Sequence, residues 1–378
     1  MSTVFGPRCE CRLQRMETIM TGQDRNDMTA GNNSSSGSIM ADMLEKVQSY
    51  LESRNWSAVP IMEGQEFEVA PLAQGEYNLN YLITSSSVQL VFRLNIGTQI
   101  EREDQILYEY KALKLLEKSG VTPRPFFVDD ARKFFDTGIL IEEYLPGEPL
   151  DYRRDLLSAA KLFAEIQSVR VPDEDNHLIR EDAPLSLIYT ECAGLLKKYF
   201  DSDLADPAIK GYLMDLISWA EEARAKERYY QEDPCPCIVN TEVNSGNFIV
   251  NRKRDTTHLV DWEMPRWGDP SQDLSHFCSP LTTLWKTSYR MTERDKQMFL
   301  RAYAESVTDK HLRDTLHERV RLRDPFVYLR GISWSAMGFV AYQTDYAGVR
   351  NPDTWATLQR YMDLDFIRSL FDPFMKQP

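Results

Sequence analysis

Cysteine, histidine and long apolar runs are scarce in this chain of 378 residues, which contains six Cys and five His. Six cysteines at this length do not make a disulfide scaffold. The pairs Cys9/Cys11 and Cys235/Cys237 have no nearby His to complete a four-ligand zinc site. We therefore expect no zinc at either pair, and we expect Cys237 to pack at the start of a buried strand.

Membrane-spanning and secretory segments are missing as well. No apolar run approaches the roughly 18 residues that a membrane span needs. The N-terminal stretch "MSTVFGPRCECRLQRMETIM" lacks the continuous apolar core of a signal peptide. These absences predict a cytoplasmic protein without a membrane partner.

An excess of basic residues is also absent, because the net charge is −14. This balance argues against nucleic acid and anionic membranes as main partners. It would suit a cationic small substrate, although an acidic balance is also common among soluble proteins. The contents of 42% hydrophobic and 27% charged residues are ordinary for a globular chain. The length indicates one large domain or two lobes and leaves the oligomeric state open.

Three regions differ in composition and periodicity. Residues 1–39 include the linker-like "TAGNNSSSGS" and show no periodicity, so we expect a disordered N-terminal tail. Residues 40–146 contain five short strand-like runs, with a helical stretch at about 101–118 between the third and the fourth. Residues 147–378 are mainly helical in pattern, with a small strand ribbon inserted at about 237–262. The predicted fold class is α+β, with a strand-rich N-lobe and a helical C-lobe.

The N-lobe contains two features that suit a nucleotide. Gly75 in "AQGEYNLNYLI" lies in a turn between two strands, which could place backbone N–H groups over phosphates or could be a plain hairpin. Arg93 stands among apolar residues in "QLVFRLN", where a cation is costly unless it is paired. Glu109 on the following helix is its expected partner, and the alternative is a surface arginine on an edge strand.

The C-lobe contains polar residues at the spacing of a phosphoryl-transfer site. In "NTEVNSGNFIV", Glu242 could orient or deprotonate an attacking hydroxyl, and Asn247 could hold Mg²⁺. Asp261 ends the apolar run "HLVDW", where it could bind the same metal. These features match the parts of a phosphoryl-transfer site, and they occur in this order: a glycine turn, a cation on a strand, a Glu on a helix, the Glu-x4-Asn loop and an Asp at the end of a strand.

In this order, residues 68–280 resemble the aminoglycoside phosphotransferase and choline kinase family, which has a protein-kinase-like bilobal fold with a small antiparallel-sheet N-lobe. "GEYNLNYLI" is similar to its nucleotide loop and "VFRLN" to its phosphate-contacting strand. "ILIEEYLPGEPL" resembles its hinge, "NTEVNSGNFIV" its catalytic loop, and "LVDWEMPRWGDPSQDLSHF" its metal-binding segment. The resemblance implies ATP and Mg²⁺ as cofactors and these nucleotide-binding residues: Gly75, Asn78, Tyr81, Arg93, Glu109, Glu142 and Tyr144.

The resemblance also implies the reaction and its remaining residues. The family phosphorylates a hydroxyl of a small, often cationic molecule, with Glu242 catalytic and Asn247 and Asp261 at the metal. Trp334, Tyr342 and Asp345 are candidates for the acceptor pocket, where aromatic rings and a carboxylate could enclose an ammonium group. Aromatic residues at helical spacing equally suit a core.

Two departures from the family pattern concern the catalytic loop, where Asn240 replaces His and Glu242 replaces Asp. Asn240 could reproduce the hydrogen bonds of an architectural His. Glu242 keeps a carboxylate but moves it by roughly 1 Å, and a displacement of that order can lower a rate about 10²-fold. The alternative to an active kinase is therefore a nucleotide-binding pseudokinase with a regulatory role, and nucleotidyl transfer is a third option.

The segment "GDPSQDL" has a structural interpretation. Asp269 as N-cap, followed by Pro270, predicts the start of a helix. We expect Asp273 to brace the catalytic loop rather than to take part in the chemistry.

Overall fold

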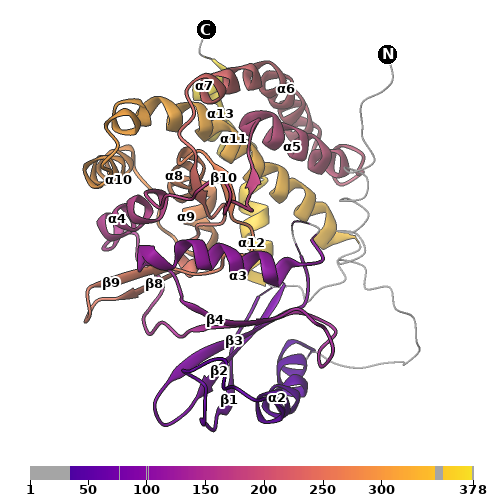
Figure 1. Ribbon diagram of the computed structural model, residues 1–378. Helices are drawn as coiled ribbons and strands as arrows, with labels where there is room; N and C mark the ends of the chain where they lie inside the picture. The colour runs from indigo at the N-terminus through magenta and orange to yellow at the C-terminus, as the bar shows by residue number, and fades with distance from the viewer. Residues whose placement is uncertain (1–34, 76, 99, 101, 345–351, 377–378) are drawn as a thin grey trace.

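The computed structural model describes residues 35–75, 77–98, 100, 102–344 and 352–376, and it has a small sheet lobe below a larger helical lobe (Figure 1). The predicted bilobal α+β fold is confirmed. The small lobe is a five-stranded antiparallel sheet in the order β1-β2-β3-β5-β4. Its strands are β1 (Glu68–Gln74), β2 (Asn78–Thr84), β3 (Gln89–Asn95), β4 (Pro125–Asp129) and β5 (Ile139–Glu143).

The two faces of this sheet differ in chemistry because successive side chains of a strand point to opposite faces. One face is apolar and packs against α2 (Ser35–Ser53), through residues that include Leu79, Tyr81, Phe92 and Ile141. Arg93 lies on the other face, opposite Asn80 on β2 and Leu140 on β5. The polar face is therefore the one that meets the helical lobe.

The helix α2 begins inside the segment that we expected to be a disordered tail. It starts at Ser35, so residues 35–39 are helical and that part of the prediction is wrong. Residues 1–34 lie outside the described residues. Apolar residues of α2 are buried against the sheet, and this burial stabilises the helix beyond its intrinsic propensity.

A second helix, α3 (Gln105–Leu116), lies between the sheet and the helical lobe (Figure 1). It covers the central part of the predicted stretch at 101–118. A short 3₁₀ turn, Glu117–Ser119, follows it, and Gly120 with φ of 71° ends the element. Glycine adopts this left-handed conformation without the steric cost of a side chain.

The large lobe is built around the 34-residue helix α11 (Lys310–Gln343), which packs against α5, α8 and α12. The other helices are α4 (Leu156–Gln167), α5 (Pro184–Phe200), α6 (Pro207–Ala223), α7 (Arg228–Glu232), α8 (Ser271–Cys278), α9 (Pro280–Lys286), α10 (Glu293–Ser306), α12 (Pro352–Tyr361) and α13 (Leu364–Met375).

The described part of the large lobe contains five short strands, of which three lie within the ribbon predicted at about 237–262. They are β6 (Ile179–Arg180), β7 (Cys237–Val239), β8 (Phe248–Asn251), β9 (Thr256–Leu259) and β10 (Arg266–Gly268). The strands β8 and β9 form a hairpin, while β10 pairs with β6 and β7. Cys237 starts β7 and is buried, as predicted. This ribbon carries the polar loops of the candidate site.

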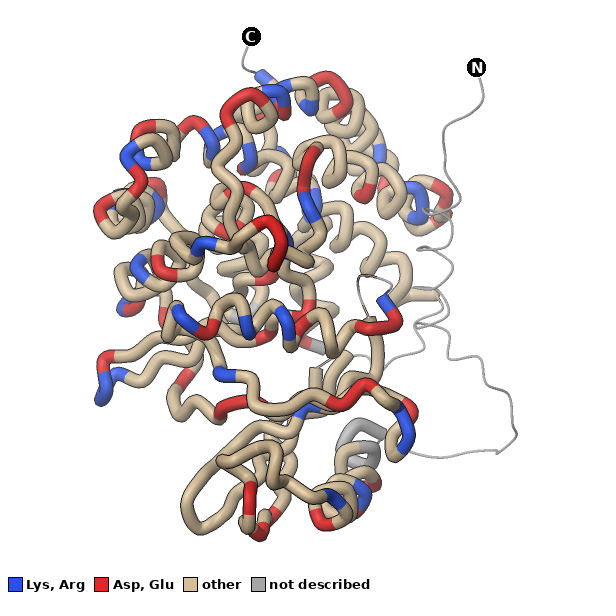
Figure 2. Tube along the Cα trace, in the orientation of Figure 1, with Lys and Arg blue, Asp and Glu red and all other residues tan. Residues whose placement is uncertain are grey.

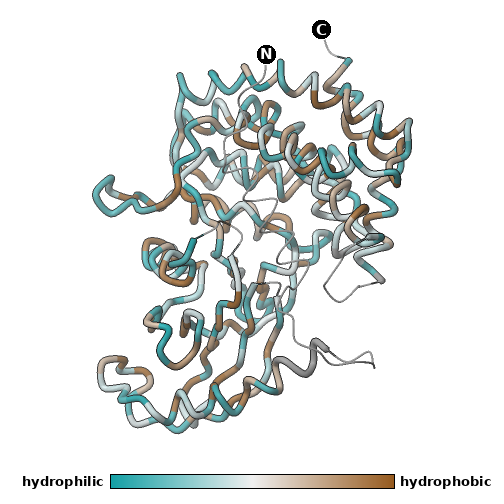
Figure 3. The backbone as a smooth tube through the Cα atoms, turned by 90° about the vertical axis from the view of Figure 1, so that its right-hand side faces the viewer, coloured by the Kyte–Doolittle hydropathy of each residue, from teal (hydrophilic) through white to brown (hydrophobic). Residues whose placement is uncertain are grey.

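Lys and Arg are interspersed with Asp and Glu along the described trace (Figure 2). Hydrophobic residues follow the strands and the inner sides of the helices (Figure 3). None of the described helices is both long enough and apolar enough to span a bilayer.

Candidate active site

Arg93 lies at the centre of a buried cluster between the lobes. Its Nε is 3.3 Å from Glu109 Oε2 on α3, as predicted, and its Nη2 pairs with Asp261 of the large lobe. Glu263 Oε2 is 3.9 Å from the same nitrogen. Arg93 is only 5% exposed, so these carboxylates replace the water that its charge has lost. The edge-strand alternative for Arg93 is wrong, because β3 is a central strand.

The carboxyl groups around Arg93 outnumber it. Burial raises the pKa of Glu109 and of Glu263 to about 8 and that of Glu142 to about 7, although Arg93 opposes each rise. Burial disfavours the charged form of Arg93 as well, but Glu109, Asp261, Glu142 and Glu263 together raise its pKa. Additional positive charge near these carboxyl groups, such as that of a bound cation, would favour their charged forms.

The catalytic-type loop is held from beneath by Asp273 of α8. Its two carboxylate oxygens accept hydrogen bonds from the backbone N–H groups of Asn240 and Thr241, both at 2.8 Å. Thr241 has φ of 73°, a conformation that is costly for a residue with a β-branched side chain. His276 Nδ1 lies 2.9 Å from the Thr241 carbonyl oxygen. The predicted bracing role of Asp273 is confirmed.

Asn240 connects the loop to the metal-binding segment. Its Nδ2 donates to the carbonyl oxygen of Asp261 at 2.9 Å, and its Oδ1 accepts from the N–H of Glu242 at 3.0 Å. The residue is 1% exposed. The amide thus supplies both a donor and an acceptor at the position where the family pattern has His.

Glu242 and Asn247 are joined through the loop backbone. Asn247 Nδ2 donates to the Glu242 carbonyl oxygen at 2.8 Å, and Val260 N–H donates to the Asn247 carbonyl oxygen at 2.8 Å. Asp261 follows directly with φ of 66°. The Asn247 side-chain amide and the Asp261 carboxylate thus belong to adjoining, hydrogen-bonded segments.

The charge of Glu242 acts on the part of the large lobe where α5 and α11 meet. Arg330 of α11 pairs with Glu191 of α5 through its Nε at 3.3 Å. Glu191, and more weakly Glu242, raise the pKa of Arg330 against the opposing effect of burial. The predicted catalytic carboxylate is therefore next to a charged pair on two helices.

Mg²⁺ fits the oxygen donors of this site. The Asn247 amide and the carboxylates of Asp261 and Glu263 are the hard ligands that this ion prefers. Within the described ranges, no group of three or more His, Cys, Asp or Glu side chains forms a metal site by itself. A cation here would thus depend also on the amide, on phosphate oxygens and on water.

The sequence reasoning predicted Asn78 but missed three residues that interact with it or with one another, namely Asn95, Gln105 and Glu263. Asn78 Nδ2 donates to Glu263 Oε2 at 2.7 Å, and Asn95 Nδ2 donates to Asn78 Oδ1 at 3.1 Å. Gln105 of α3 donates to the Glu263 carbonyl oxygen. Glu263 therefore ties the sheet, α3 and the large lobe together. The sequence feature that could have predicted the role of Glu263 was its position two residues after Asp261 in "DWE".

Some predicted residues lie away from the cluster. Tyr81 is on the opposite sheet face, where its hydroxyl donates to the Met40 carbonyl oxygen at 3.1 Å, so the structure contradicts its placement at the nucleotide. Gly75 lies in an exposed hairpin turn, and its N–H donates to the Asn78 carbonyl oxygen. Tyr144 is half-buried just beyond β5.

The proposed acceptor residues are not brought together. Tyr342 is buried and stacks on Trp355 of α12 with an interplanar angle of 5°, so it belongs to the core. Trp334 is 38% exposed on α11, two helical turns from Tyr342. Asp345 lies outside the described residues. The predicted aromatic box is therefore not formed by Trp334 and Tyr342.

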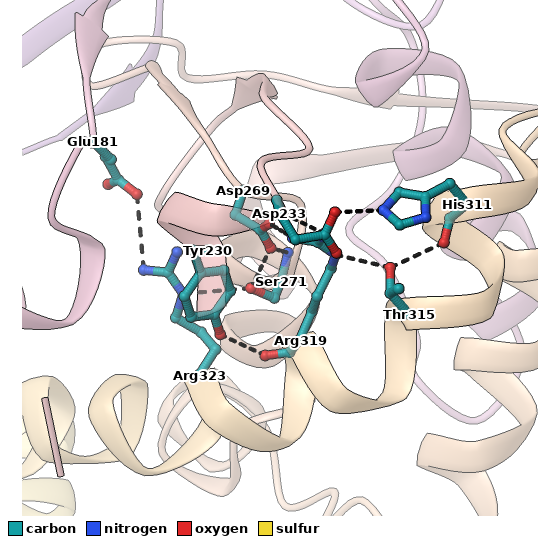
Figure 4. A network of polar contacts seen from close by, with 9 residues as sticks. All are labelled: Glu181, Tyr230, Asp233, Asp269, Ser271, His311, Thr315, Arg319 and Arg323. Atoms are coloured by element: carbon teal, nitrogen blue, oxygen red, sulfur yellow. Dashed lines mark hydrogen bonds and ion pairs between the residues drawn. The ribbon is translucent and has the colours of Figure 1, made fainter. Parts of the chain in front are cut away.

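A buried polar network supports the start of α8 (Figure 4). Arg319 of α11 is fully buried, with Nη1 2.6 Å from Asp269 Oδ2 and Nη2 2.9 Å from Asp233 Oδ2. Asp269 Oδ1 also accepts from Ser271 N–H at 3.0 Å. The helix starts one residue later than predicted, with Pro270 at its N-cap, but the Asp269 side chain still caps its first turn.

Comparisons with known proteins agree with this geometry. A sequence profile described as the phosphotransferase enzyme family matches residues 68–315. The chain belongs to the phosphotransferase enzyme family. No curated protein matches it.

Solved structures with the same fold share little sequence with the chain. The ethanolamine kinase of Plasmodium vivax is 14% identical, with 98% of each chain covered and a TM-score of 0.58. An AMP-bound spectinomycin phosphotransferase is 13% identical over 88% of this chain and 99% of that chain, with a TM-score of 0.56. An aminoglycoside phosphotransferase is 13% identical, covering 84% and 98%, with a TM-score of 0.51. At these identities the likeness establishes the fold alone.

Proposed function

We propose that this protein is an ATP- and Mg²⁺-dependent kinase that phosphorylates a hydroxyl group of a small molecule. The observation that carries the proposal is the cluster around Arg93, where one buried guanidinium is surrounded by the carboxyl groups of Glu109, Glu142, Asp261 and Glu263. A site of this kind can bind a metal ion and the phosphates that accompany it. Family membership and the spectinomycin phosphotransferase with bound AMP support the nucleotide assignment.

Each residue has a proposed role in this reaction. Arg93 contacts the phosphates and is oriented by Glu109. Asn247, Asp261 and Glu263 hold Mg²⁺, which when bound neutralises the charge of the transferring phosphoryl group. Glu242 orients the acceptor hydroxyl and accepts its proton. The backbone near Glu142 and Tyr144 holds the base, and Gly75 and Asn78 lie in the loop over the phosphates.

The acceptor is a small hydroxylated molecule that approaches Glu242 from the side of α5 and α11. The ethanolamine, spectinomycin and aminoglycoside kinases that share the fold suggest an amine-bearing compound. The exposed Trp334, one helical turn from Arg330, stays a candidate contact for it.

The decisive experiment measures ADP formation by the full chain with Mg·ATP and pooled hydroxylated amines, aminoglycosides and sugars. Glu242→Ala should lower the acceptor-dependent rate by about 10²- to 10⁴-fold, which is the usual contribution of a positioned base. Glu305→Ala, at an exposed position on α10, is the matched control and should leave the rate unchanged. Release of pyrophosphate in place of ADP would instead reveal nucleotidyl transfer.

A second function is favoured by the replacement of the family's His and Asp by Asn240 and Glu242. The chain would then be a pseudokinase that binds Mg·ATP without turnover and acts by interaction. Binding without ADP formation for any member of the pool would support it. A rise in activity on Glu242→Asp would show that only the length of the Glu242 side chain limits the chemistry.

A further inference from the structure

His276 of α8 is a histidine that the proposed reaction leaves without a role, although it contacts the catalytic loop. Its Nδ1 lies 2.9 Å from the carbonyl oxygen of Thr241, the buried residue that precedes Glu242. Because a carbonyl oxygen can only accept a hydrogen bond, Nδ1 carries the proton and donates it. The contact therefore fixes both the orientation of the ring and the tautomer of His276.

The peptide group that joins Thr241 to Glu242 is held at both of its edges. Its carbonyl oxygen accepts from His276 Nδ1, and its N–H donates to Asn240 Oδ1 at 3.0 Å. A peptide group is planar, so hydrogen bonds on opposite edges fix the plane that carries the Cα atom of Glu242. The direction in which the Glu242 side chain leaves the backbone therefore depends on His276 as well as on Asn240.

Thr241 needs this support because its backbone conformation is costly. Its φ of 73° lies in the left-handed region, which a β-branched residue adopts only where surrounding contacts hold it. Its N–H donates to Asp273 Oδ1 at 2.8 Å, and its hydroxyl donates to the Met264 carbonyl oxygen at 3.1 Å. His276 is the third of these contacts, and among the described residues it is the one that holds the carbonyl group.

The surroundings of His276 keep its ring neutral. Burial, and then the charge of Arg330, lower the pKa of His276 to about 4, although the hydrogen bond with Thr241 opposes the shift. Arg330 also lies near Glu242, whose charge raises the pKa of Arg330. An imidazolium ion beside a carboxylate would lower its affinity for a proton. A neutral His276 can therefore hold the loop without weakening Glu242 as a base.

We propose that His276, in its Nδ1–H form, is a positioning residue that aims the Glu242 carboxylate by holding the Thr241 carbonyl oxygen. The inference rests on the proposed function, in which Glu242 orients the acceptor hydroxyl. His276 acts through the backbone of the loop and not on the reacting atoms. It lies three residues after Asp273 in α8, so a single helical turn presents both side chains to the loop.

The tautomer of His276 can be measured whether or not the enzyme turns over. The full chain is labelled with nitrogen-15 at histidine, of which the sequence has five, and His276→Phe identifies the resonances of residue 276. Nδ1 should be protonated and Nε2 unprotonated, and this state should persist from about pH 8 to about pH 6, because the pKa is about 4. A proton on Nε2 alone would overturn the proposal.

Three substitutions of His276 separate the donor from the rest of the side chain. Asn carries an N–H on the atom bonded to Cγ, as His does at Nδ1, whereas Gln places it one bond further out and Phe lacks it. Amide exchange of the loop 240–247, followed by mass spectrometry, should quicken roughly tenfold in His276→Phe and His276→Gln, the factor for about one lost hydrogen bond. It should stay slow in His276→Asn and in the control His317→Phe, which alters an exposed position on α11.

The same variants should divide in kcat for ADP formation, measured with the acceptor that the pooled assay identifies. His276→Phe should lower kcat by about ten- to a hundredfold, the effect of a displacement of about 1 Å, and should leave the dissociation constant of Mg·ATP unchanged. His276→Asn should retain most of kcat. If His276→Phe does not fold, the comparison of His276→Asn with His276→Gln still decides the question.

Unchanged loop exchange and kcat in His276→Phe would overturn the proposal. Failure of His276→Asn to restore them, or an equal loss of kcat and of Mg·ATP affinity in His276→Phe, would overturn it as well and assign His276 a general structural role. If the unaltered protein formed no ADP while its loop exchange responded as expected, the proposed function would fail and the hold of His276 on the Glu242 backbone would stand.

Discussion

At the residue scale, Asn240 has the most testable role in the catalytic loop. It joins Glu242 to Asp261 through one hydrogen bond in each direction, at 3.0 and 2.9 Å. Asn240→Ala removes both bonds and frees the backbone that carries Glu242. We expect kcat to fall by about ten- to a hundredfold, since displacements of about 1 Å have effects of that size. The dissociation constant of Mg·ATP should change less than kcat.

The matched control for Asn240 is Asn244→Ala in the same loop. The Asn244 side chain accepts from the N–H of Gly246 at 2.9 Å, and within the described part of the chain no hydrogen bond joins it to Asp261. Its loss should affect kcat less than the loss of Asn240. Equal effects of the two variants would show that the loop needs general order rather than this particular connection.

Residue chemistry also decides which parts of the site could be predicted. The pairing of Arg93 with Glu109 could be predicted from the cost of burying a charge. The bracing role of Asp273 could be predicted from the positions of the motifs. The location of Tyr81 was predicted wrongly, although the sequence contained the signal for it. It is three positions from Asn78 on the same strand, and residues an odd number apart face opposite sides of a sheet. Glu263 lies in a loop, where no periodicity reports its direction.

At the element scale, the start of α8 determines the shape of the catalytic loop. Asp273 holds two backbone N–H groups, and burial raises its pKa to about 7 against the effect of these bonds. Asp273→Asn places an amide where two acceptors are needed, so one buried donor loses its partner. We expect a loss of about 1–3 kcal/mol in the free energy of unfolding. Urea denaturation measures this change.

An exposed Asp→Asn change calibrates the expected loss. Asp314 of α11 is exposed and pairs with Lys310 within the same helix, so Asp314→Asn should destabilise the protein much less than Asp273→Asn does. If Asp273→Asn were no more destabilising than Asp314→Asn, the hydrogen bonds from the loop to Asp273 would contribute little to the free energy of unfolding.

The elements themselves were predicted better than their ends. The helix α5 and the strands of the small lobe agree with the sequence pattern, because their apolar residues repeat at the period of a helix or a strand. The helix α2 starts earlier than expected, since Ser, Gly and Asn indicate a linker locally and packing of the following turns against the sheet extends the helix. The pairing order of the strands is a tertiary property that no local pattern contains.

At the scale of the whole molecule, the two lobes meet through buried acidic groups, and this arrangement predicts how stability depends on pH. Burial raises the pKa of Glu109 and Glu263 to about 8 and that of Glu142 to about 7, from a usual value of 4.5. Groups with a raised pKa in the folded state contribute stability that is complete below the unfolded pKa and is lost as pH rises through the folded pKa. The unliganded protein should therefore lose stability between about pH 4.5 and pH 8.

Calorimetric melting across this pH range tests the expectation, with Glu263→Gln as the comparison. Gln stays neutral at every pH and can still accept the hydrogen bond from Asn78, so its melting temperature should fall less steeply than that of the unaltered protein. The difference between the two curves should reach roughly 1–3 kcal/mol at high pH. Added Mg²⁺ should stabilise the unaltered protein more at pH 8.5 than at pH 6, because a metal ligand must be deprotonated. If the melting temperatures of the two proteins changed in parallel with pH, the pKa of Glu263 would not differ between the folded and unfolded states. This result would contradict the assignment of the carboxyl cluster as the cation site between the lobes.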